Sequence, residues 1–485
     1  MEKDNFFKNS FLLTASNITT GILGFIFSIY LSHVLGPEGM GLYNLVMPIY
    51  NLFICMMSAG ISASISKISA VYAEKQENGN LIKTINTVAV FNIVWAIVIG
   101  ILVFIFAPFI GKYGINDVRA IDAIRVTCPA MIFIALSNIL KGYFWGTSKI
   151  TMPAIIDIFE KALRILTVAI LIFLFSAKEL TTLVTLCYVA LCLGELQSLV
   201  LLYFYYRQCA KKLPKTYEKT ERRSQLLFNV LIICLPLTLN GFLSNIFNTL
   251  STLVVPRCLI TAGFDHTEAL AMIGKFSGMA MMIIGIPLIV VSSINTLLIP
   301  DLSQTLVKGN YYDAAVRIRK VIKIAFILGL ATTTICCLIP NSLGELFYQR
   351  DDLGKYILYA GLTAPVFFTS TTMFGILNGI NKQGIILRNS LIVAALELVG
   401  LYVSLFFTSL VSLVINLYEV KKHIELKLSL ANVIIFILLA VLTFLVLRTI
   451  IRKFFLPLNF ANTIFIIILT FVIFVFWGTF GEFEE

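Results

Sequence analysis

Long apolar stretches recur along the whole chain and are separated by short polar segments, and each is close to the ~20 residues that a membrane-spanning helix needs. They lie near residues 10–35, 42–66, 86–110, 121–140, 152–176, 181–206, 226–256, 268–299, 321–341, 356–378, 428–447 and 458–478. The stretch 385–418 fits one span or a shortened pair of spans, since two spans with a turn need roughly 42 residues. The pattern predicts an all-α integral membrane protein with about 14 transmembrane helices, or 13 if 385–418 crosses once.

Basic residues predict the orientation of these helices, because lysine and arginine are enriched in cytoplasmic loops. The longest polar segment, 207–223, reads RQCAKKLPKTYEKTERR, and the segment 308–323 is also basic. Both are expected in the cytoplasm together with the N-terminus, whereas 257–267 and the loops around 112–119 and 350–355 are expected outside. The polar N-terminus runs into a long apolar stretch, which favours a retained first helix over a cleaved signal peptide.

The linker 207–223 divides the chain into two hydrophobic halves that resemble one another weakly. Ile139-Leu140-Lys141-Gly142 recurs as Ile376-Leu377-Asn378-Gly379, and Gly79-Asn80 recurs as Gly309-Asn310. An even number of spans in each half makes the repeats parallel, which is typical of transporters whose substrate site lies between the halves. We therefore expect an N-terminal six-helix lobe (1–206), a cytoplasmic basic linker (207–223), a C-terminal lobe (224–420) and two extra C-terminal helices (421–485).

Composition narrows the function. The 485 residues are 59% hydrophobic and 13% charged, about half the charge of an average soluble domain. A soluble enzyme and a nucleic-acid-binding domain are therefore disfavoured, and the net charge of +11 fits basic cytoplasmic loops. The chain has no GxxxxGK[ST], HExxH or GxSxG motif, and neither a CxxC pair nor a histidine cluster. These absences predict a non-enzyme with no metal or cofactor.

Charged residues inside spans are costly, roughly 2.5–3.5 kcal/mol each at a helix centre, so they must face protein or water. The fifth predicted span carries Asp157, Glu160, Lys161 and Arg164 along one helical side. Two i,i+4 pairs, Asp157–Lys161 and Glu160–Arg164, are expected to form a structural charge ladder. The alternative, which does not exclude the first, is a polar wall of a transport pathway with Arg164 available to an anion.

Three more charges lie within spans. Lys67 and Lys275 either extend toward the interface or present a cation to a cavity. Glu195 has no cation nearby in sequence, so it is protonated, paired across helices, or a candidate for ion coupling.

Uncharged polar stripes mark the first span of each half. They contain Asn17, Gly21, Gly24 and Ser28, and Asn240, Ser244, Asn248 and Thr252. Helix–helix contacts explain such stripes as well as a cleft does. We take Asn17 and Asn248 as candidate substrate-binding residues together with Lys67, Arg164 and Lys275.

Three motifs, in order along the chain, resemble the stage V sporulation protein B family. One is a Lys-Gly-Tyr-Phe-x-Gly run at 141–146, followed by Pro153 and by Glu160 with Arg164. The others are found at 251–257, 274–280 and 298–303, and at 35–43, Gly60 and 65–67. The chain departs from that family at 385–418, which is shorter by roughly ten residues.

The resemblance implies a member of the multidrug/oligosaccharidyl-lipid/polysaccharide exporter superfamily, with two six-helix lobes around a central cavity. Its relatives include flippases of lipid II and of lipid-linked polysaccharide units, and the sporulation member is associated with spore cortex synthesis. The implied location is the cell membrane, in a sporulating cell the membrane that surrounds the forespore. The implied substrate is a lipid-linked oligosaccharide pyrophosphate, and peptidoglycan synthases are implied partners.

We therefore expect a flippase for a lipid-linked peptidoglycan precursor. The alternatives are a flippase for another lipid-linked polysaccharide unit and an ion-coupled multidrug exporter. Unpaired cations at Lys67, Arg164 and Lys275 would favour the anionic lipid, and unpaired carboxylates at Glu195 and Glu397 would favour a cationic drug. Without an ATP-binding motif, an ion gradient, the membrane potential or downstream consumption must drive transport.

Overall fold

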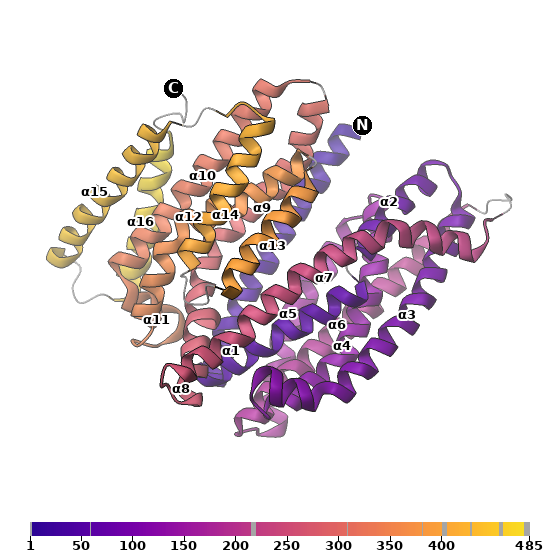
Figure 1. Cartoon of the computed structure of the whole chain (residues 1–485), viewed down its shortest axis with the longest axis horizontal. Helices are drawn as coiled ribbons and strands as arrows, with labels where there is room; N and C mark the ends of the chain where they lie inside the picture. Colours follow the sequence, from indigo (N-terminus) through magenta and orange to yellow (C-terminus); the bar gives the residue numbers. More distant parts are fainter. Residues whose placement is uncertain are drawn as a thin grey trace. The chain divides into compact units, whose positions relative to one another are not determined.

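The described part of the chain is built from helices. The computed structural model describes residues 2–58, 60–214, 220–307, 309–380, 382–399, 405–426, 429–454 and 459–479. Throughout these ranges the secondary-structure elements are α-helices and two short π-helices, labelled η1 and η2 (Figure 1). The all-α class predicted from the apolar stretches is confirmed.

The first compact unit comprises Met1–Phe27 and Val34–Leu270. Its elements are α1 (Glu2–Ser58), α2 (Ile61–Glu74), α3 (Asn78–Phe109), η1 (Ile110–Ile115), α4 (Ala120–Gly146), α5 (Thr151–Phe175), α6 (Leu180–Lys212), α7 (Arg223–Thr261) and most of α8 (His266–Ile273). The element α1 contains the first two predicted spans. It is broken at Gly36, whose φ of 63° requires glycine, and Pro37 begins the second segment.

The second unit comprises Ser28–His33 and Ala271–Glu485. Its elements are η2 (Gly274–Ala280), α9 (Met281–Val307), α10 (Tyr311–Leu338), α11 (Pro340–Tyr348), α12 (Gly354–Gly379), α13 (Gln383–Val399), α14 (Leu405–His423), α15 (Leu430–Phe454) and α16 (Phe460–Thr479). The ambiguous stretch 385–418 thus contributes to two helices, α13 and α14, which contact one another. The predicted lobe and linker boundaries remain a prediction.

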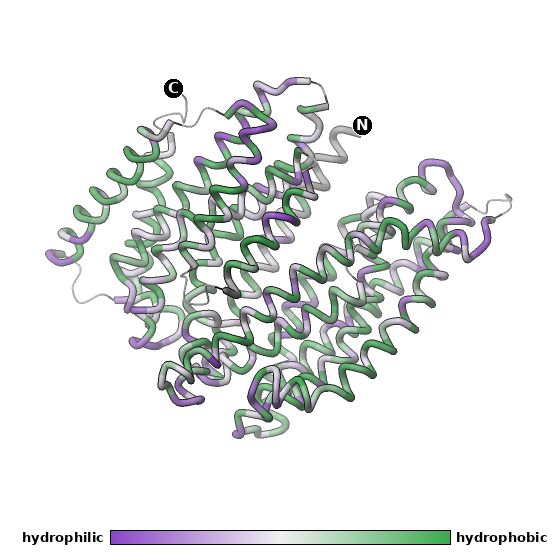
Figure 2. The backbone as a smooth tube through the Cα atoms, in the orientation of Figure 1, coloured by the Kyte–Doolittle hydropathy of each residue, from purple (hydrophilic) through white to green (hydrophobic). Residues whose placement is uncertain are grey.

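Ten helical segments of the described chain are long and apolar enough to cross a membrane. One of them, Thr14–Glu74, covers both spans of α1 and α2. The charges of α5, the short length of α13 and the charges near the end of α14 set these three helices apart from the ten. Figure 2 shows hydrophobic positions along the helices and hydrophilic positions near many of their ends. The chain is a multi-pass membrane protein, while the total of 14 or 13 spans remains a prediction.

The helices α4 and α12 occupy corresponding central positions in the two units. Each packs against several neighbours, α4 against α2, α3 and α6, and α12 against α9, α10 and α14. A Cβ on Gly142 would meet Ser62 and Ile65 of α2, and a Cβ on Gly379 would meet Ile299 and Leu302 of α9. The repeated Ile-Leu-x-Gly motif therefore makes the same kind of close helix contact in both units.

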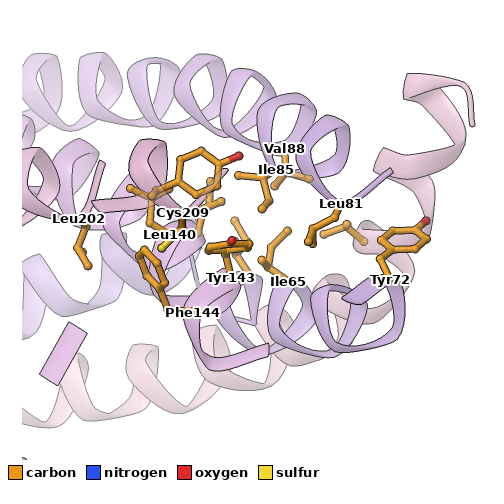
Figure 3. Packing of buried hydrophobic residues seen from close by; sticks show 14 of the residues in the cluster. Ile65, Tyr72, Leu81, Ile85, Val88, Leu140, Tyr143, Phe144, Leu202 and Cys209 are labelled. Atoms are coloured by element: carbon orange, nitrogen blue, oxygen red, sulfur yellow. The ribbon is translucent and has the colours of Figure 1, made fainter. Parts of the chain in front are cut away.

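The core of the first unit lies around the end of α4. Figure 3 shows Tyr143 and Phe144 of α4 among Ile65 of α2 and aliphatic residues of α3 and α6. Tyr143 and Phe144 are fully buried, and their rings meet edge to face with centroids 5.1 Å apart. Aromatic burial of this kind dominates core energetics, so the Lys-Gly-Tyr-Phe motif is in part a packing motif.

The first turns of α3 hold two parts of the basic linker. The Asn78 side chain donates to the Pro214 carbonyl at 3.1 Å, and Asn80 accepts from the backbone amide of Glu221 at 2.9 Å. Lys83 donates to the Thr220 hydroxyl and to the Glu221 carbonyl. The linker residues 214 and 220–221 are thereby fixed against the first unit.

Candidate functional site

The charges predicted in the fifth span meet α6 inside the first unit. Gly194 of α6 makes this approach possible, since a Cβ at that position would lie 2.7 Å from Glu160 Oε1 and 3.6 Å from Arg164 Nε. Glu160 and Arg164 are 5% and 8% exposed in their side chains, and Glu195 of α6 is 10% exposed. We call Glu160, Arg164 and Glu195 the buried ion cluster.

Arg164 sits between the two carboxylates of this cluster. Its Nη2 donates to Glu160 Oε1 on its own helix and to Glu195 Oε1 across the helix interface at 3.2 Å. Lys161, which is 36% exposed, adds a contact of 3.2 Å to Glu160 Oε2. The predicted Glu160–Arg164 pair is confirmed, and of the three alternatives for Glu195 the structure has the pairing across helices.

The second predicted pair of the ladder, Asp157–Lys161, was wrong. Asp157 instead accepts from Lys141 Nζ of α4 at 2.6 Å, and Lys161 turns to Glu160. The reason is that Lys141 comes from a neighbouring helix and that Glu160 is the more buried carboxylate. The six charged residues of this group therefore balance, three cations against three anions: Lys141, Lys161 and Arg164 against Asp157, Glu160 and Glu195.

Tyrosines of α1 and α6 border the buried ion cluster, and sequence reasoning did not identify them. Tyr188 donates to the Tyr43 carbonyl at 2.8 Å, and the two rings stack with centroids 4.9 Å apart. Tyr50 interacts electrostatically with Glu195 and Arg164. Among the described residues the buried Tyr50 hydroxyl and Arg164 Nε have no hydrogen-bond partner. Tyr188 lies seven residues before Glu195 on one side of α6, which is the available sequence signal, whereas Tyr43 and Tyr50 come from α1 and share no helix with the charges.

The other candidate residues of the first unit differ from the buried ion cluster in their exposure. Asn17 of α1, Lys67 of α2 and Asn248 of α7 are all exposed, whereas Arg164 is buried. The roles predicted for these residues, and the central cavity predicted between the lobes, remain predictions. The side chains of Asn240 and Glu397 fall outside the residues whose burial is described.

Lys275 belongs to a charged group in the second unit. Its Nζ lies 2.8 Å from Asp352 Oδ2 and 5.9 Å from the centre of the Tyr356 ring. Arg350 binds the same carboxylate with two hydrogen bonds, of 2.9 Å from Nε and 2.8 Å from Nη2. The unpaired Lys275 that would favour an anionic lipid is not found, because Asp352, which lies far along the chain on another element, neutralises it.

A neutral polar network joins α12, α13 and α14 in the second unit. Ser370 and Ser412 share a hydrogen bond of 2.9 Å, Asn416 donates to Ser412, and Asn389 donates to Asn416. Arg388 closes the network by donating to Asn389 and to Glu419. A cavity of about 310 Å³ between these helices has a mixed lining of polar and apolar residues, namely Ser370, Thr371, Ser390, Thr408, Ser409, Ser412 and Asn416 together with Phe367, Phe374, Leu377, Ile386 and Val393.

An apolar cavity of about 380 Å³ lies elsewhere in the second unit. It is bordered by helices α9, α10, α11 and α16. Its lining comprises Ile283, Ile286, Pro287, Val290, Leu328, Thr332, Ile335, Cys336, Leu343, Phe347, Ile467 and Phe471. Such a lining suits a hydrocarbon chain. The helix α11 borders this cavity with Leu343 and Phe347 and ends just before Arg350, so apolar and cationic groups follow one another there.

Comparison with known proteins places these features in context. The model of a family described as "Polysaccharide biosynthesis protein" matches residues 6–306, more than half of the chain. Stage V sporulation protein B of Bacillus subtilis (strain 168) is 24% identical over 402 residues, which cover 82% of this chain and 77% of that relative. The lipid II flippase MurJ of the same organism is 22% identical over 399 residues, which cover 78% and 73%.

The fold is also known. A solved structure of a lipid II flippase MurJ in an inward closed conformation matches with a TM-score of 0.71 at 15% identity, covering 96% of this chain and 99% of that chain. The resemblance to the stage V sporulation protein B family is thereby confirmed. The chain is a multi-pass membrane protein of the flippase and exporter type, a transporter rather than an enzyme.

Proposed function

The chain belongs to the polysaccharide biosynthesis protein family, and we propose that it flips a lipid-linked peptidoglycan precursor of the lipid II type during spore cortex synthesis. The names of two relatives, a stage V sporulation protein and a lipid II flippase, support this substrate. Under this proposal the protein acts in the membrane that surrounds the forespore and hands its cargo to peptidoglycan synthases.

The observation that carries the proposal is the arrangement in the second unit. An apolar cavity there borders α11, and the cations Lys275 and Arg350 lie at or just beyond the end of that helix. A lipid-linked sugar pyrophosphate has these two parts, a hydrocarbon tail and an anionic head. The tail needs apolar surroundings, and the head needs cations such as arginine and lysine.

We propose that Lys67 and Lys275 serve the headgroup one after the other. Lys67 lies near the predicted cytoplasmic end of its span, whereas Lys275 lies near the predicted outer end. The exposed amides of Asn17 and Asn248 are candidates for contacts with the sugars. Arg164 has a different place, because Glu160 and Glu195 already neutralise it, and its first role in the proposal is to hold α5 and α6 together.

The driving force is part of the same proposal. Glu195 is the candidate coupling residue, since a proton or cation that binds it would release one of the two carboxylates from Arg164. Glu160 would keep both of its cations, Arg164 and the half-buried Lys161. An ion gradient or the membrane potential could thus act on α6 through a change in one charge.

The test uses purified full-length protein in lipid vesicles. Fluorescent lipid II on the outer leaflet becomes inaccessible to a membrane-impermeant quencher when it is flipped. We expect faster loss of quenching with the protein than in empty vesicles, and slower loss with Lys67→Gln, compared with Lys67→Arg as the charge-preserving control. Equal rates with and without the protein would contradict the proposal.

A second candidate function is the ion-coupled export of cationic drugs. The two buried carboxylates Glu160 and Glu195 favour it, since carboxylates bind cations. Arg164 weakens this alternative because it neutralises both of them. A cationic dye in the same vesicles separates the two functions, and lipid-linked units with other sugars separate the peptidoglycan precursor from other polysaccharide units.

A further inference from the structure

Each unit carries a group of three charges at the same place in the fold. In the first unit Arg119 donates to Glu38 at 2.7 Å and to Asp117 at 2.7 Å, and we call these three residues the first triad. In the second unit Asp352 accepts from Lys275 and Arg350, both at 2.8 Å, and we call these the second triad. Each triad ties the beginning of one long helical segment to the turn before α4 or α12.

The two turns have matching backbones. Asn116 and Gln349 both adopt left-handed conformations, with φ of 64° and 53°. The next residue donates its amide to a glycine carbonyl in each case, Asp117 to Gly111 at 3.0 Å and Arg350 to Gly344 at 3.2 Å. Corresponding positions in the triads can therefore be compared one by one.

All three charges are inverted between the triads. Arg350 corresponds to Asp117 of the first unit, and Asp352 corresponds to Arg119. The two members of each pair are the same number of residues apart. Lys275 lies as many residues after Glu38 as Gly379 lies after Gly142 in the repeated Ile-Leu-x-Gly motif. Lys275 therefore corresponds to Glu38. The first triad has two carboxylates around one cation and a net charge of −1, whereas the second has two cations around one carboxylate and a net charge of +1.

Inversion changes what each triad can bind. In the second triad, Lys275 Nζ and Arg350 Nη2 both lie 2.8 Å from the same oxygen of Asp352, so two cations converge on one anionic oxygen. This is how a phosphate oxygen is bound by lysine and arginine. Neighbouring Asp351 and Lys355 are both exposed and offset each other in charge.

We infer that the second triad is an anion-binding site in which the Asp352 carboxylate holds the place of a phosphate or pyrophosphate group. The incoming anion displaces Asp352 from Lys275 and Arg350, and no covalent bond changes. The triad is 21% to 35% exposed in its side chains, so the exchange needs only a movement of the turn that carries Arg350 and Asp352. This inference rests on the proposed function, in which the anion is the headgroup at the predicted outer end.

The charge state of Asp352 supports the exchange. Hydrogen bonds from Arg350, and then from Lys275, hold the pKa of the Asp352 carboxyl below its ordinary value. Asp352 is therefore an anion at neutral pH and competes with any other anion for the two cations. Neutralising it removes the competitor and leaves both cations in place.

The experiment titrates inorganic pyrophosphate into the purified full-length protein by calorimetry. Asp352→Asn should bind pyrophosphate about tenfold more tightly than the natural protein, because the competing carboxylate is gone and both cations are available to the anion. The matched control is Asp117→Asn of the first triad, which should gain nothing because Glu38 still neutralises Arg119. No gain for Asp352→Asn, or an equal gain for Asp117→Asn, overturns the inference.

A second variant covers the case in which Asp352→Asn does not fold. Lys275→Gln in the otherwise natural protein should weaken pyrophosphate binding about tenfold, and Lys275→Arg should restore it. Unchanged binding by a folded Lys275→Gln protein overturns the inference. Thermal unfolding of each variant verifies that it is folded.

Two further arms identify the source of the anion and separate this inference from the proposed function. The titration is repeated with a sugar-free prenyl pyrophosphate in nanodiscs, and a gain with this probe alone identifies a lipid headgroup, whereas a gain with both probes identifies the phosphate group itself. The flipping assay is independent. If the natural protein does not flip lipid II while Asp352→Asn still gains affinity, the proposed substrate is wrong and the anion site stands.

Discussion

The α5–α6 interface of the first unit and the α12–α14 interface of the second unit both bury polar groups, but with different chemistry. The first interface places one guanidinium between the carboxylates of Glu160 and Glu195. The second uses serine hydroxyls and the amides of Asn389 and Asn416, and the ion pair between Arg388 and Glu419 lies at one end of that network.

This difference determines how much stability each interface loses when one of its residues is substituted. A buried charge without its partner is strongly unfavourable, so the first interface tolerates little. A neutral hydrogen bond has a small net value, and its groups can find water or another hydroxyl, so the second interface tolerates more. The following predictions test this contrast, from the largest expected effect to the smallest.

Arg164→Ala should have the largest effect. It leaves Glu160 and Glu195 close together in the interior without the guanidinium, and breaking a buried pair costs about 3–5 kcal/mol. We expect little folded protein in the membrane and a low midpoint of thermal unfolding in detergent. The double variant Glu160→Gln, Arg164→Gln should recover part of the abundance. An Arg164→Ala protein as stable as the natural one would remove the basis of the comparison.

Gly194→Ala should have the next effect. The new methyl group would lie 2.7 Å from Glu160 Oε1 and push the ion pair away from α6. Overpacking of this kind typically costs about 1–3 kcal/mol, seen as a lower unfolding midpoint. The matched control is Gly285→Ala on α9, where a Cβ meets nothing within 4 Å. Equal stability of the two variants would show that the close approach of α5 and α6 is not required.

Asn416→Ala tests the neutral interface. The substitution removes the acceptor of Asn389 and the donor to Ser412. We expect the free energy of unfolding to fall by about 1–2 kcal/mol, because Asn389 keeps its hydrogen bond to Arg388 and Ser412 keeps its hydrogen bond to Ser370. Asn51→Ala, at an exposed position of α1, serves as the control with little change. A loss as large as that of Arg164→Ala would erase the contrast between the interfaces.

Arg388→Gln should have the smallest effect. The Arg388 side chain is 56% exposed and that of Glu419 is 10% exposed, so water reaches the pair from the arginine side and we expect a loss of only about 1 kcal/mol. Thermal unfolding at low and high salt should differ less for Arg388→Gln than for the natural protein, because salt screens the pair with Glu419. A large loss of stability at both salt concentrations would mean that this pair is buried in the folded protein.

The sequence predicted the helical class and the local pair Glu160–Arg164, because hydrophobic periodicity and i,i+4 spacing act within one helix. It could not predict that Glu195 completes the buried ion cluster, that Lys141 takes Asp157, or that Asp352 binds Lys275. Each of these contacts joins residues on different elements, and its existence depends on how helices pack. Gly194 was missed for the same reason, since a glycine in a helix signals a close contact only when the neighbour is known.

The way in which the start of α3 holds the linker has a practical consequence for protein engineering. Asn78 fixes Pro214, and Lys83 and Asn80 fix Glu221, so both points of attachment stay in place whatever chain connects them. Lengthening a connection between two fixed points adds only about 0.6 kcal/mol per doubling of its length. A fluorescent protein or an epitope inserted within 215–219 should thus report the location of this transporter in living cells without disturbing its fold.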